Sequence, residues 1–365
     1  MRPEAVVGDD RTSSGRAGSS LTRRWWVATL GLLVMGCSGG DRGSGSREAG
    51  REVIVYTALD QEFSEPLLLA FQKKTGVFVR PKFDVESTKT VGLTQQIIAE
   101  ADHPRCDLFW NNEILNTLRL KERGLLTPFH PAGAGDIPAG FKAKDGTWYG
   151  FAARARILLV NNHAVTEADR PTSIRDLTNP KWKGRIGLAK PLFGTTATHA
   201  TCLFAVWGEG PAQAFFKALK DNEAQIFSGN KQVAQAVSAG QIAFGLTDTD
   251  DAVGELDAGN LVTIVYPDRA TGELGTLFLP NTLALIKGSP HRAAAETLAD
   301  YLLSPEVEAA LAKGPSAQIP LNPRVATTPR VETPRTVHAM EVDFEEAARL
   351  WDKVKTFLME EFSGG

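Results

Sequence analysis

A buried strand and the entrance to a helix are encoded by Val53-Ile54-Val55-Tyr56-Thr57-Ala58-Leu59-Asp60, where an apolar run gives way to polar residues. Such a run of β-branched and aromatic residues is typical of a strand that is covered on both faces. Apolar side chains then recur every four residues, at Phe63, Leu67 and Phe71, which predicts a helix face, and Gly76 suits the helix end. A strand resumes at residues 77–79. This order of strand, helix and strand predicts parallel pairing, with helices on the sheet faces.

The same alternation continues along the chain. Further strands are predicted at residues 107–110, 157–160, 185–189, 242–246, 261–265 and 282–286. Helices are predicted between them at residues 91–100, 113–123, 196–207, 211–219 and 231–239, and an amphipathic helix at 342–362 closes the chain. Residues 321–336, rich in Pro, Thr and Arg, are interpreted as a strap. The sequence therefore predicts an α/β fold with mostly parallel sheets, and its 365 residues favour two lobes.

The start of the chain has the features of an export signal and a tether. Arg23 and Arg24 precede an apolar run at residues 25–36, which is shorter than the roughly 20 residues of a membrane-spanning helix. Val34-Met35-Gly36-Cys37 resembles a bacterial lipobox, so residues 1–37 are predicted to be a lipoprotein signal peptide whose Cys37 carries the lipid anchor. The alternative is a plain signal peptide that contains a cysteine. Residues 38–51, rich in Gly and Ser, are predicted to form a flexible tether.

Composition argues against several classes of protein. The formal net charge of −3 lacks the basic excess of a nucleic-acid surface. Cys106 and Cys202 are expected to be buried single thiols, because the two lie in segments assigned to different lobes. The sequence contains no CxxC pair and no His-rich cluster, which argues against a zinc site.

A set of motifs in a fixed order resembles the ferric-iron-type extracellular solute-binding proteins. Besides the strand at 53–58 and the helix end at 71–77, the set comprises Asp107–Trp110, Gly124-Leu125-Leu126, Trp148-Tyr149-Gly150-Phe151, Arg154-Ala155-Arg156, Asn179–Gly184 and Leu302–Glu306. The resemblance extends from Glu52 to Phe362. It implies a two-lobed periplasmic-binding-protein fold (type II) with a ligand cleft between the lobes, which closes by hinge motion.

The resemblance also implies domain boundaries and partners. Lobe 1 is expected at residues 52–155 plus 278–320 and lobe 2 at 156–277, with strands crossing between them near 154–161 and 277–286. Residues 321–365 would pack on the lobes as a strap and a helix. The function implied is that of a monomeric lipoprotein in the periplasm or at the cell surface, which delivers a small ligand to an ABC permease and its ATPase. Such a protein needs no catalytic residue and no cofactor, since any metal is cargo.

Acidic and amide side chains follow several predicted strands, where ligands bind in α/β folds. Asp60 follows the first strand, at a place where iron-binding members of the family carry a ligand residue. Asn112 and Glu113 follow the strand at 107–110, and both could serve a cation or an amine. For Asp60 and Glu113 the alternative is capping of the next helix.

A second acidic group, Asp248, Asp250 and Asp251, directly follows the strand at 242–246. Helix capping is again the alternative. Together with Asp60 and Glu113, the pair Asp250 and Asp251 is predicted to hold a metal. Carboxylates that face one closed cleft repel by ~4 kcal/mol per pair at 4 Å with an effective dielectric near 20, so closure would need a cation between them.

Groups suited to an anion occur as well. Arg154 and Arg156 lie two residues apart and share a face of an extended segment, and by resemblance Arg154 is the better candidate for pairing with an anion. Thr195 and Thr196 open a helix, where free N–H groups hold oxyanions, and Asn230 begins another. Surface exposure of the arginines and ordinary helix capping are the alternatives.

The sequence departs from the family at one place that concerns the ligand. Ferric-iron binders commonly carry a tyrosine pair where Asp250 and Asp251 stand, and this chain has only four Tyr. All-oxygen sites suit Fe³⁺ or a divalent cation. A metal bound with a synergistic anion is the first hypothesis, and an organic amine or an aminophosphonate is the second.

Two rival functions belong to other classes. An enzyme on a two-lobed scaffold could use the same carboxylates as acid and base, but the sequence has no GxSxG, HExxH or P-loop motif. A sensory ectodomain that reports a ligand to a partner without transport is the other. The predicted lipobox favours an importer component over such a receptor.

Overall fold

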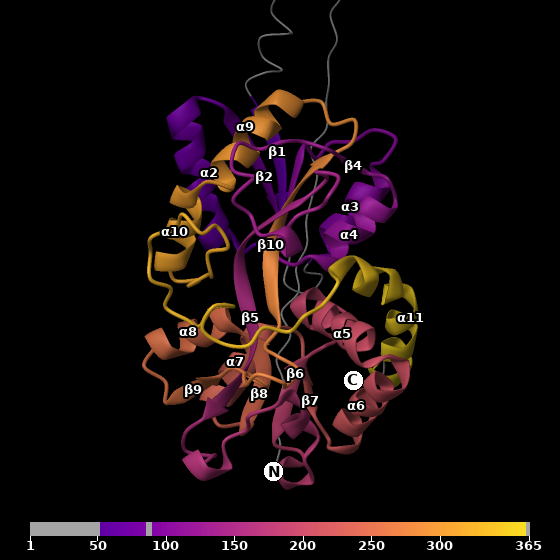
Figure 1. Cartoon of the computed structure of the whole chain (residues 1–365), viewed down its shortest axis with the longest axis vertical. Coiled ribbons are helices and arrows are strands. Elements are labelled where there is room, and N and C mark those ends of the chain that lie inside the picture. Colours follow the sequence, from indigo (N-terminus) through magenta and orange to yellow (C-terminus); the bar gives the residue numbers. More distant parts are fainter. Residues whose placement is uncertain (1–51, 85–89, 363–365) are drawn as a thin grey trace, which may run out of the picture. The chain divides into compact units, whose positions relative to one another are not determined.

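The computed structural model describes residues 52–84 and 90–362 (Figure 1). The predicted signal peptide, Cys37 and the tether lie outside the described residues. Among those that are described, no helix is both long and apolar enough to cross a membrane.

The described elements form two α/β halves. The first half contains β1 (Glu52–Thr57), α2 (Gln61–Thr75), β2 (Phe78–Phe83), α3 (Val91–Ala99), β3 (Leu108–Asn111), α4 (Leu115–Glu122), β4 (Leu126–Thr127), α9 (Arg292–Leu302) and α10 (Pro305–Lys313). The second half contains β6 (Ile186–Ala189), α5 (Gly194–Trp207), α6 (Glu209–Asp221), β7 (Gln225–Phe227), α7 (Asn230–Ser238), β8 (Phe244–Asp248), α8 (Thr249–Asp257) and β9 (Val262–Val265). Two long strands, β5 (Tyr149–Asn161) and β10 (Phe278–Ile286), connect the halves, and α11 (Phe344–Phe362) ends the described chain.

A continuous sheet runs through both halves in the order β2-β1-β3-β10-β5-β8-β6-β7, with β4 on β10 and β9 on β5. β5 pairs with β10 as far as Ala155 and with β8 from Arg156 onward, so it passes from one half to the other there. The expected parallel pairing holds for β1 with β2 and β3, and for β6 with β7 and β8. The described pairs that include β5 or β10 are antiparallel, because these strands run between the halves rather than returning through a helix.

Helices cover both faces of the first half. Val53 and Val55 of β1 pack in one cluster with side chains of α2 and α9. Tyr56 points to the other face and packs with Leu93 and Ile97 of α3. Successive residues of a strand point to opposite faces, so the unbroken apolar run at 53–56 matches a strand covered on both sides.

The second half follows the same rule. Leu158 and Val160 of β5 pack with the side chains of α5 and α6, whereas Ile157 and Leu159 pack with those of α7. The two expected single thiols are Cys106 in the first half and Cys202 in the second, and both are buried and free.

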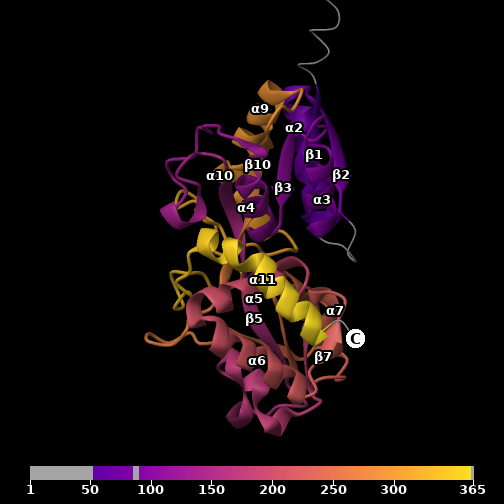
Figure 2. The same ribbon diagram turned by 90° about the vertical axis from the view of Figure 1, so that its right-hand side faces the viewer.

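The last part of the chain links the halves again. Arg324 and Arg330 of the strap form ion pairs with Asp136 of the first half and Asp257 of the second. Helix α11 then packs on α4, α5 and α6, as Figure 2 shows. Its buried side chains belong to an apolar cluster that includes residues of both halves.

Both crossing strands are irregular at the same level. Ala152 of β5 adopts a left-handed φ of 44°, and the β5–β10 register shifts between Leu279 and Asn281. The Asn281 amide donates to the Ala152 carbonyl and, at 2.9 Å, to Oε1 of Gln318. This point of the connection is therefore held by side chains rather than by a regular ladder.

Glu308 of α10 supports the same point. Its carboxylate accepts hydrogen bonds from the backbone N–H groups of Ala152 at 2.6 Å, Leu321 at 3.0 Å and Asn322 at 2.8 Å. The carboxylate therefore ties a crossing strand to the start of the strap.

Candidate ligand-binding pocket

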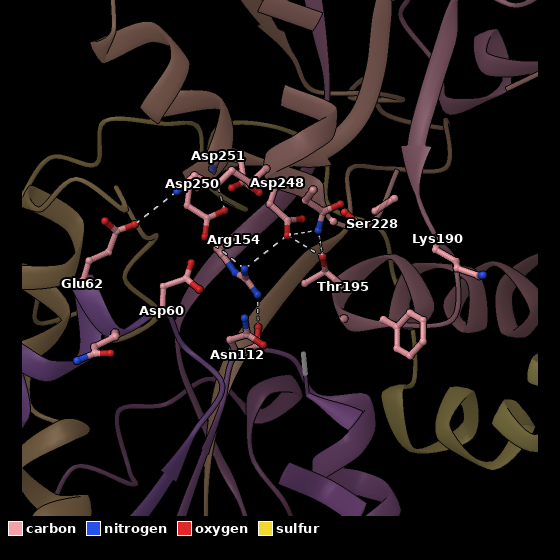
Figure 3. A pocket seen from close by; sticks show the side chains of 17 residues that line it. Asp60, Glu62, Asn112, Arg154, Lys190, Thr195, Ser228, Asp248, Asp250 and Asp251 are labelled. Atoms are coloured by element: carbon pink, nitrogen blue, oxygen red, sulfur yellow. Dashed lines mark hydrogen bonds and ion pairs between the residues drawn. The ribbon is translucent and has the colours of Figure 1, made fainter. Parts of the chain in front are cut away.

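A cavity of about 380 Å³ lies where strands of both halves end and the next helices begin (Figure 3). The first half contributes residues after β1 and β3, and the second half contributes residues after β6, β7 and β8. Openings at the carboxyl ends of strands are the usual ligand sites of α/β folds. The sequence predicted this location, because its candidate residues were chosen from the same loops.

Most of the predicted residues line this pocket. The lining includes Asp60, Asn112, Arg154, Thr195, Asn230, Asp248, Asp250 and Asp251. Segments distant in sequence are thus brought together around one space.

Glu113 is not brought to the described lining of the pocket. Its side chain is fully buried, and its carboxylate accepts hydrogen bonds from the backbone N–H groups of Leu115 at 2.5 Å and Asn116 at 3.0 Å. The hydroxyl of Thr198 on α5 donates to it at 2.7 Å. Glu113 therefore caps α4 and joins it to α5, which corresponds to the capping alternative rather than to a metal ligand.

Thr196 also lies behind the described lining. Its hydroxyl donates to Oδ1 of Asn230 and accepts from Nη2 of Arg156, both at 3.1 Å. The side chain serves the packing of the helix starts, although it was predicted to contact a ligand.

The acidic group after β8 is compact. Asp248, Asp250 and Asp251 each offer a carboxylate oxygen, and these atoms lie within 4.8 Å of one another. Asp248 occupies the N-cap position of α8, and the other two lie in its first turn, where the helix dipole favours negative charge. Asp60 occupies the N-cap position of α2 and faces the same pocket from the first half.

Arg154 lies among these carboxylates. Its Nη1 is 3.3 Å from Asp250 and 3.5 Å from Asp248, and its Nη2 donates to the carbonyl of Asn112. Burial lowers the pKa of Arg154, but the carboxylates of Asp250, Asp248 and Asp251 together raise it above its usual value. The guanidinium was predicted to pair with an anion of the ligand, and the structure shows it engaged by the protein's own acids.

Several lining residues were missed by sequence reasoning. Lys190 follows β6 directly, Ser228 follows β7, and Lys231 lies in the first turn of α7. Their position after a predicted strand or at a helix start was the available signal. No hydrogen bond or ion pair joins the Lys190 ammonium to another residue of the described chain. Lys231 lies 3.9 Å from Glu62 of α2, across the pocket from the second half to the first.

The four tyrosines of the chain are all among the described residues, and none of them lines the pocket. Burial raises the pKa of Tyr56 and Tyr266, the latter to about 12. Phenolate ligands of the kind that ferric-iron binders use are therefore absent from the described pocket.

The pocket thus presents two kinds of wall. Asp60, Asp250 and Asp251 form an acidic side, which suits a cation. On the other side α5 and α7 begin without a side-chain cap, which leaves their first N–H groups available, and both helix starts line the pocket together with Lys190. An arrangement of this kind can hold a ligand that carries both signs of charge.

Two α/β halves joined by crossing strands, with a polar pocket between them, define the class of two-lobed periplasmic binding proteins. The family described as bacterial extracellular solute-binding proteins matches residues 108–346, more than half of the 365 residues. The chain therefore belongs to that family.

Individual relatives agree with this assignment. The Fe(3+)-binding periplasmic protein of Serratia marcescens is 24% identical over 324 residues, which cover 87% of this chain and 92% of the relative. Iron-bound HitA from Pseudomonas aeruginosa superposes with a TM-score of 0.75 at 22% identity, over 84% of this chain and 99% of that one. AfuA from Actinobacillus pleuropneumoniae, with fructose-6-phosphate bound, gives 0.76 at 22% identity, over 86% and 99%. The two structures confirm the predicted two-lobed fold, and the relatives are solute-binding proteins rather than enzymes.

Proposed function

We propose that this protein is the substrate-binding lipoprotein of an ABC importer, acting as a monomer without catalysis in the periplasm or at the cell surface. In this proposal Cys37 carries the lipid anchor, and residues 38–51 tether two lobes, 52–155 plus 278–320 and 156–277. The loaded protein delivers its ligand to a permease driven by an ATPase. The family assignment supports the binding role, and the lipobox-like residues 34–37 support the anchor.

The observation that carries the proposal is the pairing of opposite chemistries in one pocket. Asp60, Asp250 and Asp251 line it on one side, and Lys190 with the uncapped start of α5 lines it on the other. The first candidate ligand is a metal ion, ferric or divalent, held by the three carboxylates together with a synergistic anion. The close carboxylates of α8 and the relatives named for ferric iron support this candidate.

The second candidate is an organic molecule with both an anionic and a cationic group, such as an aminophosphonate, or an organic amine. Arg154 supports it, because the guanidinium already contacts Asp248 and Asp250, where a metal would have to compete with it. The missing tyrosine pair points the same way, and the fructose-6-phosphate bound to AfuA supports an organic ligand with an anionic group.

Both candidates can be tested by titration calorimetry and native mass spectrometry. The ligands to compare are ferric citrate, Mn²⁺, Ca²⁺, inorganic phosphate, a polyamine and 2-aminoethylphosphonate. The double substitution Asp250→Asn with Asp251→Asn is expected to weaken the tightest ligand at least tenfold, about 1.4 kcal/mol or more. Asp257→Asn, at the end of the same helix and paired with Arg330, is the matched control and should leave affinity unchanged. Equal affinity of the double variant and the wild type would refute the site.

A further inference from the structure

Arg156 lies directly behind the second-half wall of the pocket and is fully buried. Its Nη1 is 2.6 Å from Oδ1 of Asp248 and donates to Thr195 Oγ1 and Asn230 Oδ1, both at 3.1 Å. Its Nη2 donates to Thr196 Oγ1 at 3.1 Å. One guanidinium on β5 therefore contacts the start of α5, the start of α7 and the end of β8.

These contacts occupy the side chains that were predicted to hold the ligand. Oδ2 of Asp248 accepts from Thr195 Oγ1 at 2.6 Å and from Asn230 Nδ2 at 3.0 Å, and it lies 3.5 Å from Nη1 of Arg154. The Asn230 amide also donates to Thr195 Oγ1 at 2.8 Å. The hydroxyl of Thr195 and the amide of Asn230 thus spend their hydrogen-bonding capacity on this buried network. What they leave for a ligand is the backbone N–H groups at the helix starts.

The sign of the electrostatic potential at the second-half wall of the pocket also depends on the Arg156 guanidinium. Asp248 is almost completely buried and lies within 4.8 Å of two further carboxylates. With Arg156 in place, its charge is balanced from behind and the N–H groups of α5 and α7 can attract an anion. Without Arg156, Arg154 alone would face three carboxylates, and an anion at the helix starts would be repelled in a medium of low dielectric constant.

We propose that Arg156 is the positioning residue that makes this wall accept anions, by neutralising the buried Asp248 behind the starts of α5 and α7. The inference rests on the proposed function, of which it concerns the anion-accepting side. Arg156 does this without touching the ligand, whereas from the sequence it was only noted to share a face with Arg154, the candidate anion partner.

Calorimetry with inorganic phosphate as the probe tests the inference in three variants of the full chain. Arg156→Met is expected to weaken phosphate binding at least tenfold. Adding Asp248→Asn to Arg156→Met removes the unbalanced charge and is expected to restore affinity to within about threefold of the wild type. Arg156→Lys keeps the charge but not the planar guanidinium, so its phosphate affinity should fall between those of Arg156→Met and the wild type. Arg185→Met removes an exposed arginine of the same half and should change nothing.

The charge-compensated variant separates the charge effect from packing, since removing a second charge at constant side-chain size cannot repair a packing defect. If Arg156→Met binds phosphate as the wild type does, the inference is wrong. It is equally wrong if the double variant is folded, by circular dichroism and thermal unfolding, yet binds tenfold or more weakly than the wild type. This second comparison holds even where Arg156→Met alone does not fold. A wild type that binds no phosphate would overturn the anion side of the proposed function as well, whereas the first two results leave it standing.

Discussion

His199 of α5 is an imidazole sealed in the second half, 2% exposed, and neither of its ring nitrogens has a hydrogen-bond partner among the described residues. Burial first and the nearby Arg156 second lower its pKa to about 3, against a weaker opposing effect of Asp248. The residue is therefore neutral in the folded protein at ordinary pH. In the unfolded chain it titrates near 6.5.

This difference predicts acid sensitivity with a definite sign. Between pH 6.5 and about 3 the unfolded state binds a proton that the folded state does not, so stability rises with pH through that window and is lost as pH falls. Lowering the pH from 7 to 5 should cost the wild type about 2 kcal/mol through this residue. His199→Leu should remove that loss, and it should not reduce stability at pH 7 because no hydrogen bond is given up.

Urea unfolding at several pH values measures the effect, with the exposed His163→Gln as a control that keeps the acid dependence. If the free energy of unfolding of His199→Leu depends on pH as steeply as that of the wild type, the imidazole is not the source of the acid sensitivity.

Single residues also mark the limit of sequence reasoning at the site. Asp60 and Glu113 both follow a strand and precede a helix, yet one lines the pocket and the other caps α4. Besides its local donors, the Glu113 carboxylate accepts from Thr198, which reaches it from α5 in the other half. No local pattern contains that contact. The acidic group after β8 could be predicted because it directly follows a predicted strand, where ligands bind in α/β folds.

The elements at the crossing point of the halves offer a test of their own. Glu308 of α10 receives three backbone N–H groups, and an amide oxygen in its place can serve only two of them. Glu308→Gln should therefore lower the free energy of unfolding by about 1–3 kcal/mol.

Glu306 on the same helix provides the matched comparison. Its carboxylate is 67% exposed and pairs with Lys74, so Glu306→Gln should stay within about 0.5 kcal/mol of the wild type. Denaturant unfolding of both variants measures the difference, as a shift of the transition midpoint at an unchanged dependence of the unfolding free energy on denaturant concentration. Equal effects of the two substitutions would mean that Glu308 does not hold the crossing point.

Strand β5 shows how far the element pattern could be predicted. The apolar run at residues 157–160 indicated a strand, but the structure extends it back to Tyr149. Its first part contains Gly150, Arg154 and Arg156, and it is buried because β10 and the polar network cover it. Its Tyr, Phe and Ala side chains pack into two apolar clusters, but Gly and Ala are weak strand formers, so only the resemblance to a family pointed to a crossing strand there.

At the scale of the whole molecule, α11 makes one apolar cluster out of two halves. Phe357 packs on Phe204 of α5 with ring centroids 5.7 Å apart, and Trp351 lies under Arg119 of α4. Phe357→Ala should lower the free energy of unfolding by about 3–5 kcal/mol, as for a large buried aromatic side chain.

Lys353→Ala, on the exposed side of the same helix, removes only an ion pair with Glu209 and should cost less than about 1 kcal/mol. Calorimetric melting temperatures of both variants check this. If Phe357→Ala and Lys353→Ala have the same melting temperature, the packing of α11 does not stabilise the association of the two halves.

The path of the chain also sets the order in which its parts can be completed during synthesis. As the polypeptide emerges amino end first, the second half has all its strands once β9 is out, at Val265, whereas the first half still lacks β10, α9 and α10. The half that begins first is thus finished second. Until residue 362 emerges, the faces of α4, α5 and α6 that α11 covers remain bare, and this interval is when a nascent molecule most needs a holding chaperone.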